Sequence, residues 1–164
     1  MILLTVEDKL VTVEDKLAEM GVVIPDPKPA LGSYVPAVQA GNLVFISGNL
    51  PIQADGSMLH PGKLGEDVSV EEGYVAARQC AINCLSAAKG VIGDLNKVQQ
   101  VVKLRVLVNS APDFTDQPAV ANGASDLLME LFGEEFGKHA RAAVGVASLP
   151  LGVSVEAELV LEVA

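Results

Sequence analysis

The sequence has few of the residues that bind metals or nucleic acids. It contains no tryptophan, two cysteines and two histidines, and its 11 lysines and arginines face 21 aspartates and glutamates. The formal net charge of −10 argues against a nucleic-acid partner, because contacts to phosphates need a basic face. His60, His139, Cys80 and Cys84 have no recognisable zinc-binding spacing, so no metal site is expected.

Long apolar runs are also missing. No stretch approaches the roughly 20 apolar residues that a membrane-spanning helix needs. The first residues are acidic, whereas a secretory signal begins with basic ones. We therefore expect a cytoplasmic protein without a membrane partner.

The two cysteines stand four residues apart within a helical pattern. A disulfide at that spacing would be strained inside a regular helix. Two small buried apolar residues are the favoured interpretation of Cys80 and Cys84, and a redox or metal pair is the alternative.

Half of the 164 residues are hydrophobic, mostly Val, Ala and Leu, which is enough for one domain with a two-layer core. Residues 1–30 are expected to form a helical extension and a proline-rich connector, and residues 31–164 the main domain. The extension repeats the hexapeptide TVEDKL at residues 5–10 and 12–17, too short a repeat for a solenoid. In the second copy, a capping box of Thr and Asp predicts a helix over about residues 13–20.

The main domain predicts the order ββ-α-β-α-ββ. Strands are expected where apolar residues alternate, and helices where they recur every three to four positions. The expected elements are strands at 43–47 and 50–54, a helix at 70–92, a strand at 98–108, a helix at 118–132, and strands at 141–149 and 153–163. This is an α+β pattern, with two helices packed on one face of a mixed sheet.

Turn and cap residues give several boundaries. Gly41 and Asn42 predict a tight hairpin turn before the first of these strands. Ser69, with a Glu three positions later, is a capping box for the first long helix, which Gly93 ends. Gly133 is expected to end the second.

One strand near the end of the chain combines a cation with small side chains. Arg141 begins a run in which every second residue is small, namely Ala143, Gly145 and Ala147. Such a face leaves room for a ligand or lets another backbone approach closely. In the last strand, alternation places Glu156 on the face opposite the apolar residues. From these residues alone, ion pairs on a surface and a binding site both remain open.

Four segments resemble the YjgF/RidA family, in the order found there. They are GSYV at 32–35, ISGNLP at 46–51, HARAAVGVASLP at 139–150 and VEAE at 155–158. The resemblance covers about residues 31–163. It implies a chorismate-mutase-like fold in which the last two strands are not neighbours. It also implies a homotrimer with three sites in the clefts between subunits.

Family members with this arginine hydrolyse enamine or imine intermediates, such as 2-aminoacrylate, to 2-keto acids and ammonia. The resemblance implies that Arg141 holds the substrate carboxylate and that Glu156 activates the attacking water. No cofactor is implied, because an iminium carbon is already electrophilic. The further substrate-binding positions implied by the motifs are Tyr34, Gly48, Asn122 and Ala143.

The chain departs from the family pattern at three places. Ala143 stands where many relatives have Cys, Ser33 where Pro is common, and Gly145 where a bulkier residue is usual. These changes leave the preferred substrate open. A non-catalytic trimer that binds or senses a small carboxylate is the alternative function, and a ribonuclease is less favoured because no basic patch is visible. His139 is interpreted as a partly exposed residue at a strand start, with acid/base catalysis as the alternative.

Overall fold

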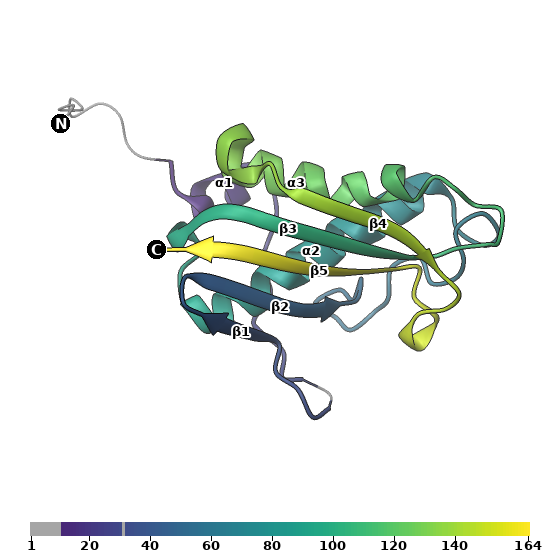
Figure 1. Cartoon of the computed structure of the whole chain (residues 1–164), viewed down its shortest axis with the longest axis horizontal. Coiled ribbons are helices and arrows are strands. Elements are labelled where there is room, and N and C mark those ends of the chain that lie inside the picture. The colour runs from purple at the N-terminus through teal and green to yellow at the C-terminus, as the bar shows by residue number, and fades with distance from the viewer. Residues whose placement is uncertain (1–10, 31) are drawn as a thin grey trace.

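The computed structural model describes residues 11–30 and 32–164 (Figure 1). The first TVEDKL copy, at residues 5–10, lies outside the described residues. The helices are α1 (Val13–Glu19), α2 (Val70–Ile92) and α3 (Gln117–Gly137), with short 3-10 turns η1 (Leu95–Lys97) and η2 (Pro150–Gly152). The strands are β1 (Ala37–Ala40), β2 (Leu43–Asn49), β3 (Val98–Asn109), β4 (Ala140–Val146) and β5 (Val155–Val163).

The strands form one five-stranded sheet in the order β1-β2-β5-β3-β4. β3 and β4 run parallel, and the other neighbours are antiparallel, so the sheet is mixed as predicted. The last two strands of the chain, β4 and β5, are separated by β3, which confirms that they are not neighbours. The turn at Gly41 and Asn42 joins β1 to β2, and Gly41 has a φ of 63° that suits glycine.

α2 and α3 cover one face of the sheet and leave the other open (Figure 1). Alternation along β5 explains the two layers: Val155, Ala157, Leu159 and Leu161 are buried under the helices, whereas the residues between them are half-exposed. The predicted α+β architecture is therefore correct.

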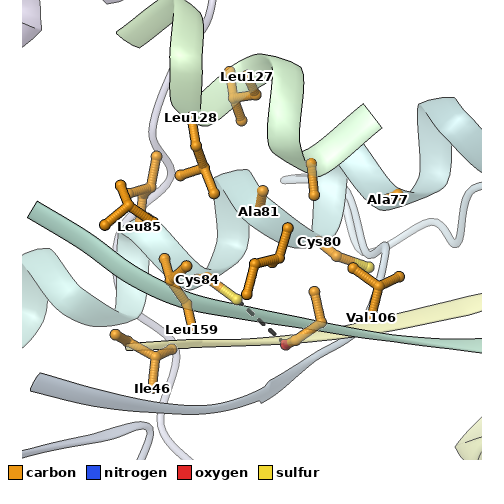
Figure 2. Packing of buried hydrophobic residues seen from close by; sticks show 14 of the residues in the cluster. Ile46, Ala77, Cys80, Ala81, Cys84, Leu85, Val106, Leu127, Leu128 and Leu159 are labelled. Atoms are coloured by element: carbon orange, nitrogen blue, oxygen red, sulfur yellow. Dashed lines mark hydrogen bonds between the residues drawn. The ribbon is translucent and has the colours of Figure 1, made fainter. Parts of the chain in front are cut away.

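The predicted bounds of α2 are confirmed because both ends carry strong signals. The Ser69 hydroxyl accepts from the Glu72 N–H at 3.2 Å, the Glu72 carboxylate accepts from the Ser69 N–H at 2.8 Å, and Gly93 ends the helix with a φ of 80°. α2 packs on β5 through small residues (Figure 2). There the buried thiols of Cys80 and Cys84 donate to the carbonyls of β5 residues at 3.5 and 3.3 Å.

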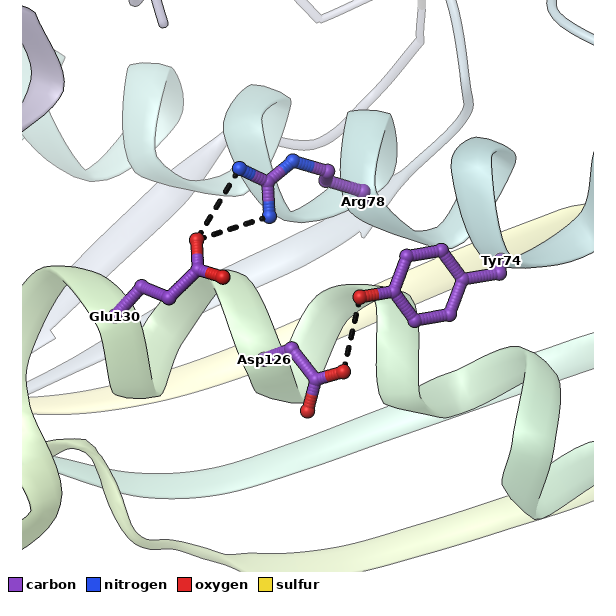
Figure 3. Close-up of polar contacts among 4 residues, drawn as sticks. All are labelled: Tyr74, Arg78, Asp126 and Glu130. Carbon is purple, nitrogen blue, oxygen red and sulfur yellow. Dashed lines mark hydrogen bonds and ion pairs between the residues drawn. The ribbon is translucent and has the colours of Figure 1, made fainter. Parts of the chain in front are cut away.

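α2 also packs closely on α3. A Cβ at Gly123 of α3 would overlap the Tyr74 carbonyl oxygen, so the contact requires glycine. On the outer side of the two helices, the Tyr74 hydroxyl donates to Asp126 at 2.9 Å, and Arg78 pairs with Glu130 at 3.3 Å (Figure 3).

α3 extends beyond its predicted end. Gly133 does leave the helical conformation, with a φ of 78°, but a further turn follows and ends at Gly137. This turn folds back onto the helix, because a Cβ at Gly137 would lie 2.7 Å from the Leu128 carbonyl oxygen. A single glycine signal predicts the break and not the turn beyond it.

The predicted strand at residues 50–54 is wrong. Ile52 makes only an isolated bridge with Met58. The Asn83 amide of α2 donates to the carbonyls of Leu50 and Ile52, both at 2.8 Å, so a side chain satisfies groups that a neighbouring strand would otherwise bind. β4 is also shorter than predicted, because it ends at Val146 and η2 intervenes before β5.

The residues before the sheet pack on the helices. The capping box of Thr12 and Asp15 is present, and Leu17 of α1 is buried in the core. The Ser86 hydroxyl donates to the Pro25 carbonyl at 2.7 Å and so ties the proline-rich connector to α2. Within the described ranges, no helix has both the length and the apolar character to cross a bilayer.

Candidate active site

The six predicted site residues fall into two groups on opposite faces of the sheet. Arg141 pairs in register with Leu104, which is fully buried under the helices, so its side chain lies on the helix-covered face. Glu156 pairs with Leu107 and alternates with buried residues, so its side chain lies on the open face. The structure therefore does not bring Arg141 and Glu156 together within one chain.

The first group lies between β4 and α3. The Nη1 atom of Arg141 donates to Asn122 Oδ1 at 2.7 Å and to Ser125 Oγ at 3.1 Å. No described residue bonds the Nε or Nη2 atom of Arg141, and the side chain is exposed. A guanidinium held through one nitrogen keeps its other edge open, and that edge matches the two oxygens of a carboxylate. Ala143, two residues along β4, is partly buried against the core.

The second group lies on the open face. Tyr34, Gly48 and Glu156 line one hollow of about 610 Å³, together with cationic and apolar side chains from four strands. Tyr34 and Gly48 also line a second cavity of about 190 Å³, which lies between the proline-rich connector and α2. Tyr34 therefore lies at the edge of the hollow that contains Glu156.

A β-bulge and a glycine make room for Glu156. The register between β2 and β5 shifts between Ile46 and Asn49, which is the sign of an extra residue in β2. Within the bulge, a Cβ on Gly48 would lie 2.9 Å from the Glu156 Cδ and would overlap its Oε1. The carboxylate can rest against the β2 backbone only because residue 48 has no side chain.

Among the described acids of the open face, Glu156 is the one without a side-chain partner. Its neighbour Glu158 pairs with Arg105 at 3.6 Å, whereas no described residue bonds the Glu156 carboxylate. Burial raises the pKa of Glu156 above its ordinary value, and the charge of Glu158 raises it further. A half-buried carboxylate with a raised pKa is suited to accept a proton.

Sequence reasoning missed two polar contacts near the first group. Ser125 was not among the expected site residues, although its spacing of three from Asn122 places both on one face of α3. His139 is partly exposed, as interpreted, but both of its ring nitrogens have partners: Ser125 Oγ at 3.0 Å and the Gly137 carbonyl at 2.6 Å. Asn122 lies within α3, and its Oδ1 accepts a hydrogen bond from Arg141.

Another missed contact anchors the end of β4. The Lys63 ammonium donates to Asn109 Oδ1 at 2.7 Å and to the Ala147 carbonyl at 2.6 Å. The Asn109 amide in turn donates to the carbonyls of Gly62 and Val153, both at 3.1 Å. Lys63 therefore has a structural role, because it ties the loop before α2 to the end of the strand that carries Arg141.

The fold and the site define an α+β protein with an arginine and an unpaired glutamate on opposite faces of an open mixed sheet. The family model for YjgF/chorismate mutase-like proteins matches residues 14–162. The chain belongs to this family, also called YjgF/RidA.

The chain is also similar to named proteins and to solved structures. Protein TCP17 of Trypanosoma cruzi is 46% identical over 146 residues, which cover 89% of this chain and 91% of that protein. A 2-iminobutanoate/2-iminopropanoate deaminase of Dermatophagoides farinae is 30% identical, covering 82% of this chain and 88% of that protein. The crystal structure of Atu1372 from Agrobacterium tumefaciens, of unknown function, is 42% identical with a TM-score of 0.85, and the match covers 93% of this chain and 94% of that one.

Proposed function

We propose that this protein hydrolyses small imines that carry a carboxylate, of the 2-iminopropanoate type, to 2-keto acids and ammonia. The observation that carries the proposal is that Arg141 and Glu156 have opposite charges and that each keeps hydrogen-bonding capacity free for a ligand. One is a cation with an open edge, and the other is an unpaired carboxylate in a hollow. The deaminase name of a relative at 30% identity supports the same reaction class.

Arg141 is proposed to hold the substrate carboxylate. Its Nε–Nη2 edge would form two parallel charge-assisted hydrogen bonds, which fix the orientation of the imine as well as its position. Orientation is what this reaction needs most, because the imine carbon is already electrophilic.

Glu156 is proposed to act as the general base. Its carboxylate takes a proton from water while the water oxygen bonds to the imine carbon and the π electrons move to nitrogen. The carboxylic acid then returns this proton to nitrogen. The hydroxyl proton of the carbinolamine then passes through Glu156 to the nitrogen, so that the C–N bond breaks, neutral ammonia leaves, the carbonyl forms and the carboxylate is restored.

Because the two residues lie on opposite faces, we propose that two chains contribute to each site within a homotrimer. The open face exposes the apolar side chains of Val38, Phe45 and Val144, at 51%, 47% and 41%. A neighbouring copy packed there would cover these residues. It would also bring its own Arg141 towards the hollow around Glu156. The same contact would repeat from copy to copy and close into a ring after three copies.

The test is turnover of enzymatically generated 2-aminoacrylate, followed by keto-acid release, for the parent and for Arg141→Ala. Acceleration by the parent and not by the variant is expected. Equal acceleration by both would overturn the role of Arg141. If neither accelerates the reaction but the parent binds 2-keto acids, the protein is a carboxylate-binding trimer, the alternative that the preformed Arg141 group also supports.

A further inference from the structure

We propose that Ser125 and His139 position Arg141 for carboxylate binding, so that the arginine is oriented by a relay of hydrogen bonds that begins at the backbone of Gly137. This inference rests on the proposed role of Arg141. Neither Ser125 nor His139 needs to touch the substrate.

The direction of the relay follows from its first bond. His139 Nδ1 lies 2.6 Å from the Gly137 carbonyl oxygen. A carbonyl oxygen only accepts, so Nδ1 carries the proton. In the neutral imidazole the other nitrogen, Nε2, is then bare and acts as an acceptor.

The second bond fixes the serine. Ser125 Oγ lies 3.0 Å from the bare Nε2 of His139 and therefore donates its hydrogen there. Its lone pairs then face the third partner, Arg141 Nη1, at 3.1 Å. Without His139, the hydroxyl of a helical serine would turn towards the carbonyl of a preceding helical turn. His139 thus orients the Ser125 hydroxyl so that its oxygen accepts from the arginine.

Together, Ser125 and Asn122 hold Arg141 through a single nitrogen. Both residues accept from Nη1, at 3.1 and 2.7 Å, and lie one turn apart on α3. Two acceptors on one nitrogen set the plane of the guanidinium and direct its free edge away from the helix. Ser125 is only 8% exposed, so water competes little for its bond to His139. An exposed arginine without this support would sample many rotamers, and binding would cost more entropy.

The turn beyond Gly133 gives the relay its fixed origin. This turn folds back so that Gly137 packs against the backbone of Leu128 and Met129, where a Cβ would lie 2.7 and 2.8 Å from their atoms. The Gly137 carbonyl is therefore anchored on α3 itself. The helix end, His139 and Arg141 follow one another within five positions of the chain, and the fold-back aligns them.

The experiment compares Ser125→Ala, His139→Leu and His139→Gln with the parent and with Arg141→Ala. Binding of pyruvate by titration is measured together with KM and kcat for 2-aminoacrylate. Ser125→Ala and His139→Leu are expected to raise the pyruvate Kd and the KM about three- to tenfold, as for one lost hydrogen bond to an exposed charge. The kcat should stay within about twofold, because catalytic groups are retained. His139→Gln keeps an acceptor for Ser125 and should recover most of the affinity.

Two matched variants separate positioning from folding. Ser86→Ala removes an equally buried helix hydroxyl that donates to Pro25, and His60→Leu removes the other histidine, which lies beside Glu72. Both should leave the pyruvate Kd unchanged. If Ser125→Ala lowers the melting temperature and reduces kcat and affinity together, the role of the serine is structural and the inference is overturned.

A spectroscopic readout stays independent of the reaction. The ¹⁵N shifts of His139 should show a protonated Nδ1 and a bare Nε2, and the Arg141 side-chain N–H groups should exchange faster in Ser125→Ala. The opposite tautomer would overturn the relay. If Arg141→Ala binds pyruvate as well as the parent does, the proposed function fails while these signals still test the relay. If Arg141→Ala loses binding but Ser125→Ala does not, the relay alone is wrong.

Discussion

The carboxylate of Glu156 occupies the space that a Cβ on Gly48 would need. The two residues come from neighbouring antiparallel strands, β2 and β5, at the bulge where their register shifts. The backbone of one strand therefore forms the wall against which the proposed base rests. This contact makes the smallest residue of the site as important as the charged ones.

Gly48→Ala should destabilise the fold, because the new methyl group overlaps Glu156. Overpacking of this kind costs about 1–3 kcal/mol, partly offset by about 0.4–1 kcal/mol from the stiffer unfolded chain. Urea unfolding followed by circular dichroism gives the change. In a Glu156→Ala background the loss should vanish, since the overlapping group is gone. An equal loss in both backgrounds would show that the overlap is not its cause.

Activity should fall on the acid side as Glu156 becomes protonated. Burial and Glu158 raise its pKa, so the acid limb of the pH–rate profile should lie above the ordinary value of 4.5. The residual activity of Glu156→Gln should lack this limb, because an amide side chain does not titrate in this pH range. A limb at or below 4.5 would count against Glu156 as the base.

The same raised pKa has a consequence for stability. A folded-state pKa above the unfolded one means that the folded state binds the proton more tightly, so Glu156 stabilises the fold at low pH and loses that contribution as pH rises through its folded pKa. Glu156→Gln should therefore gain stability relative to the parent at pH 7 and not at pH 4. Unfolding at both values measures this, and a gain of the same size at pH 4 would contradict it.

Mixed trimers should regain activity from two inactive variants. If each site takes Arg141 from one chain and Glu156 from another, co-refolded Arg141→Ala and Glu156→Gln chains leave about a quarter of the sites intact for random mixing in a cyclic trimer. The turnover of 2-aminoacrylate measures the recovery, and native mass spectrometry confirms the mixing. The double variant mixed with Glu156→Gln is the control and should stay inactive. Mixed trimers without recovery would show that Arg141 and Glu156 do not meet across a subunit interface.

The two thiols should report unfolding of the whole domain. Cys80 and Cys84 are fully buried, and burial raises the pKa of Cys84 to about 12, so neither forms a thiolate in the folded protein near pH 8. A disulfide reagent such as Ellman's should react only as urea unfolds the chain, in step with the loss of helical signal. Rapid labelling of the native protein would show that α2 opens locally.

The sequence was most informative where chemistry is local. The bounds of α2 could be predicted because Ser69 and Gly93 act on their own helix ends. The strand at residues 50–54 was mispredicted because apolar and polar residues do alternate there, as in a strand. Its carbonyls, however, accept from the Asn83 side chain, which lies about 30 positions away in the sequence, and not from a neighbouring strand. Local pattern cannot reveal what a carbonyl will bind across the fold.

The same limit applies to the site. The family motifs selected Arg141 and Asn122, and the structure brings these two into contact. Ser125 belongs to none of the family motifs. Its contact with Arg141 depends on how α3 lies beside β4 and on the fold-back at Gly137, and neither can be predicted from the local sequence. The separation of Arg141 from Glu156 likewise depends on strand order, which spacing along the chain does not determine.

The central place of β5 has a consequence for how the protein is made. A ribosome synthesises β5 after the other four strands, yet β5 joins β2 to β3 and bonds with both. Until β5 has emerged, no strand joins the β1–β2 hairpin to the β3–β4 pair. α2 also lacks the strand whose carbonyls accept from its two thiols. The nascent chain therefore has to wait with exposed apolar surface, and it is in this interval that a chaperone would be most useful.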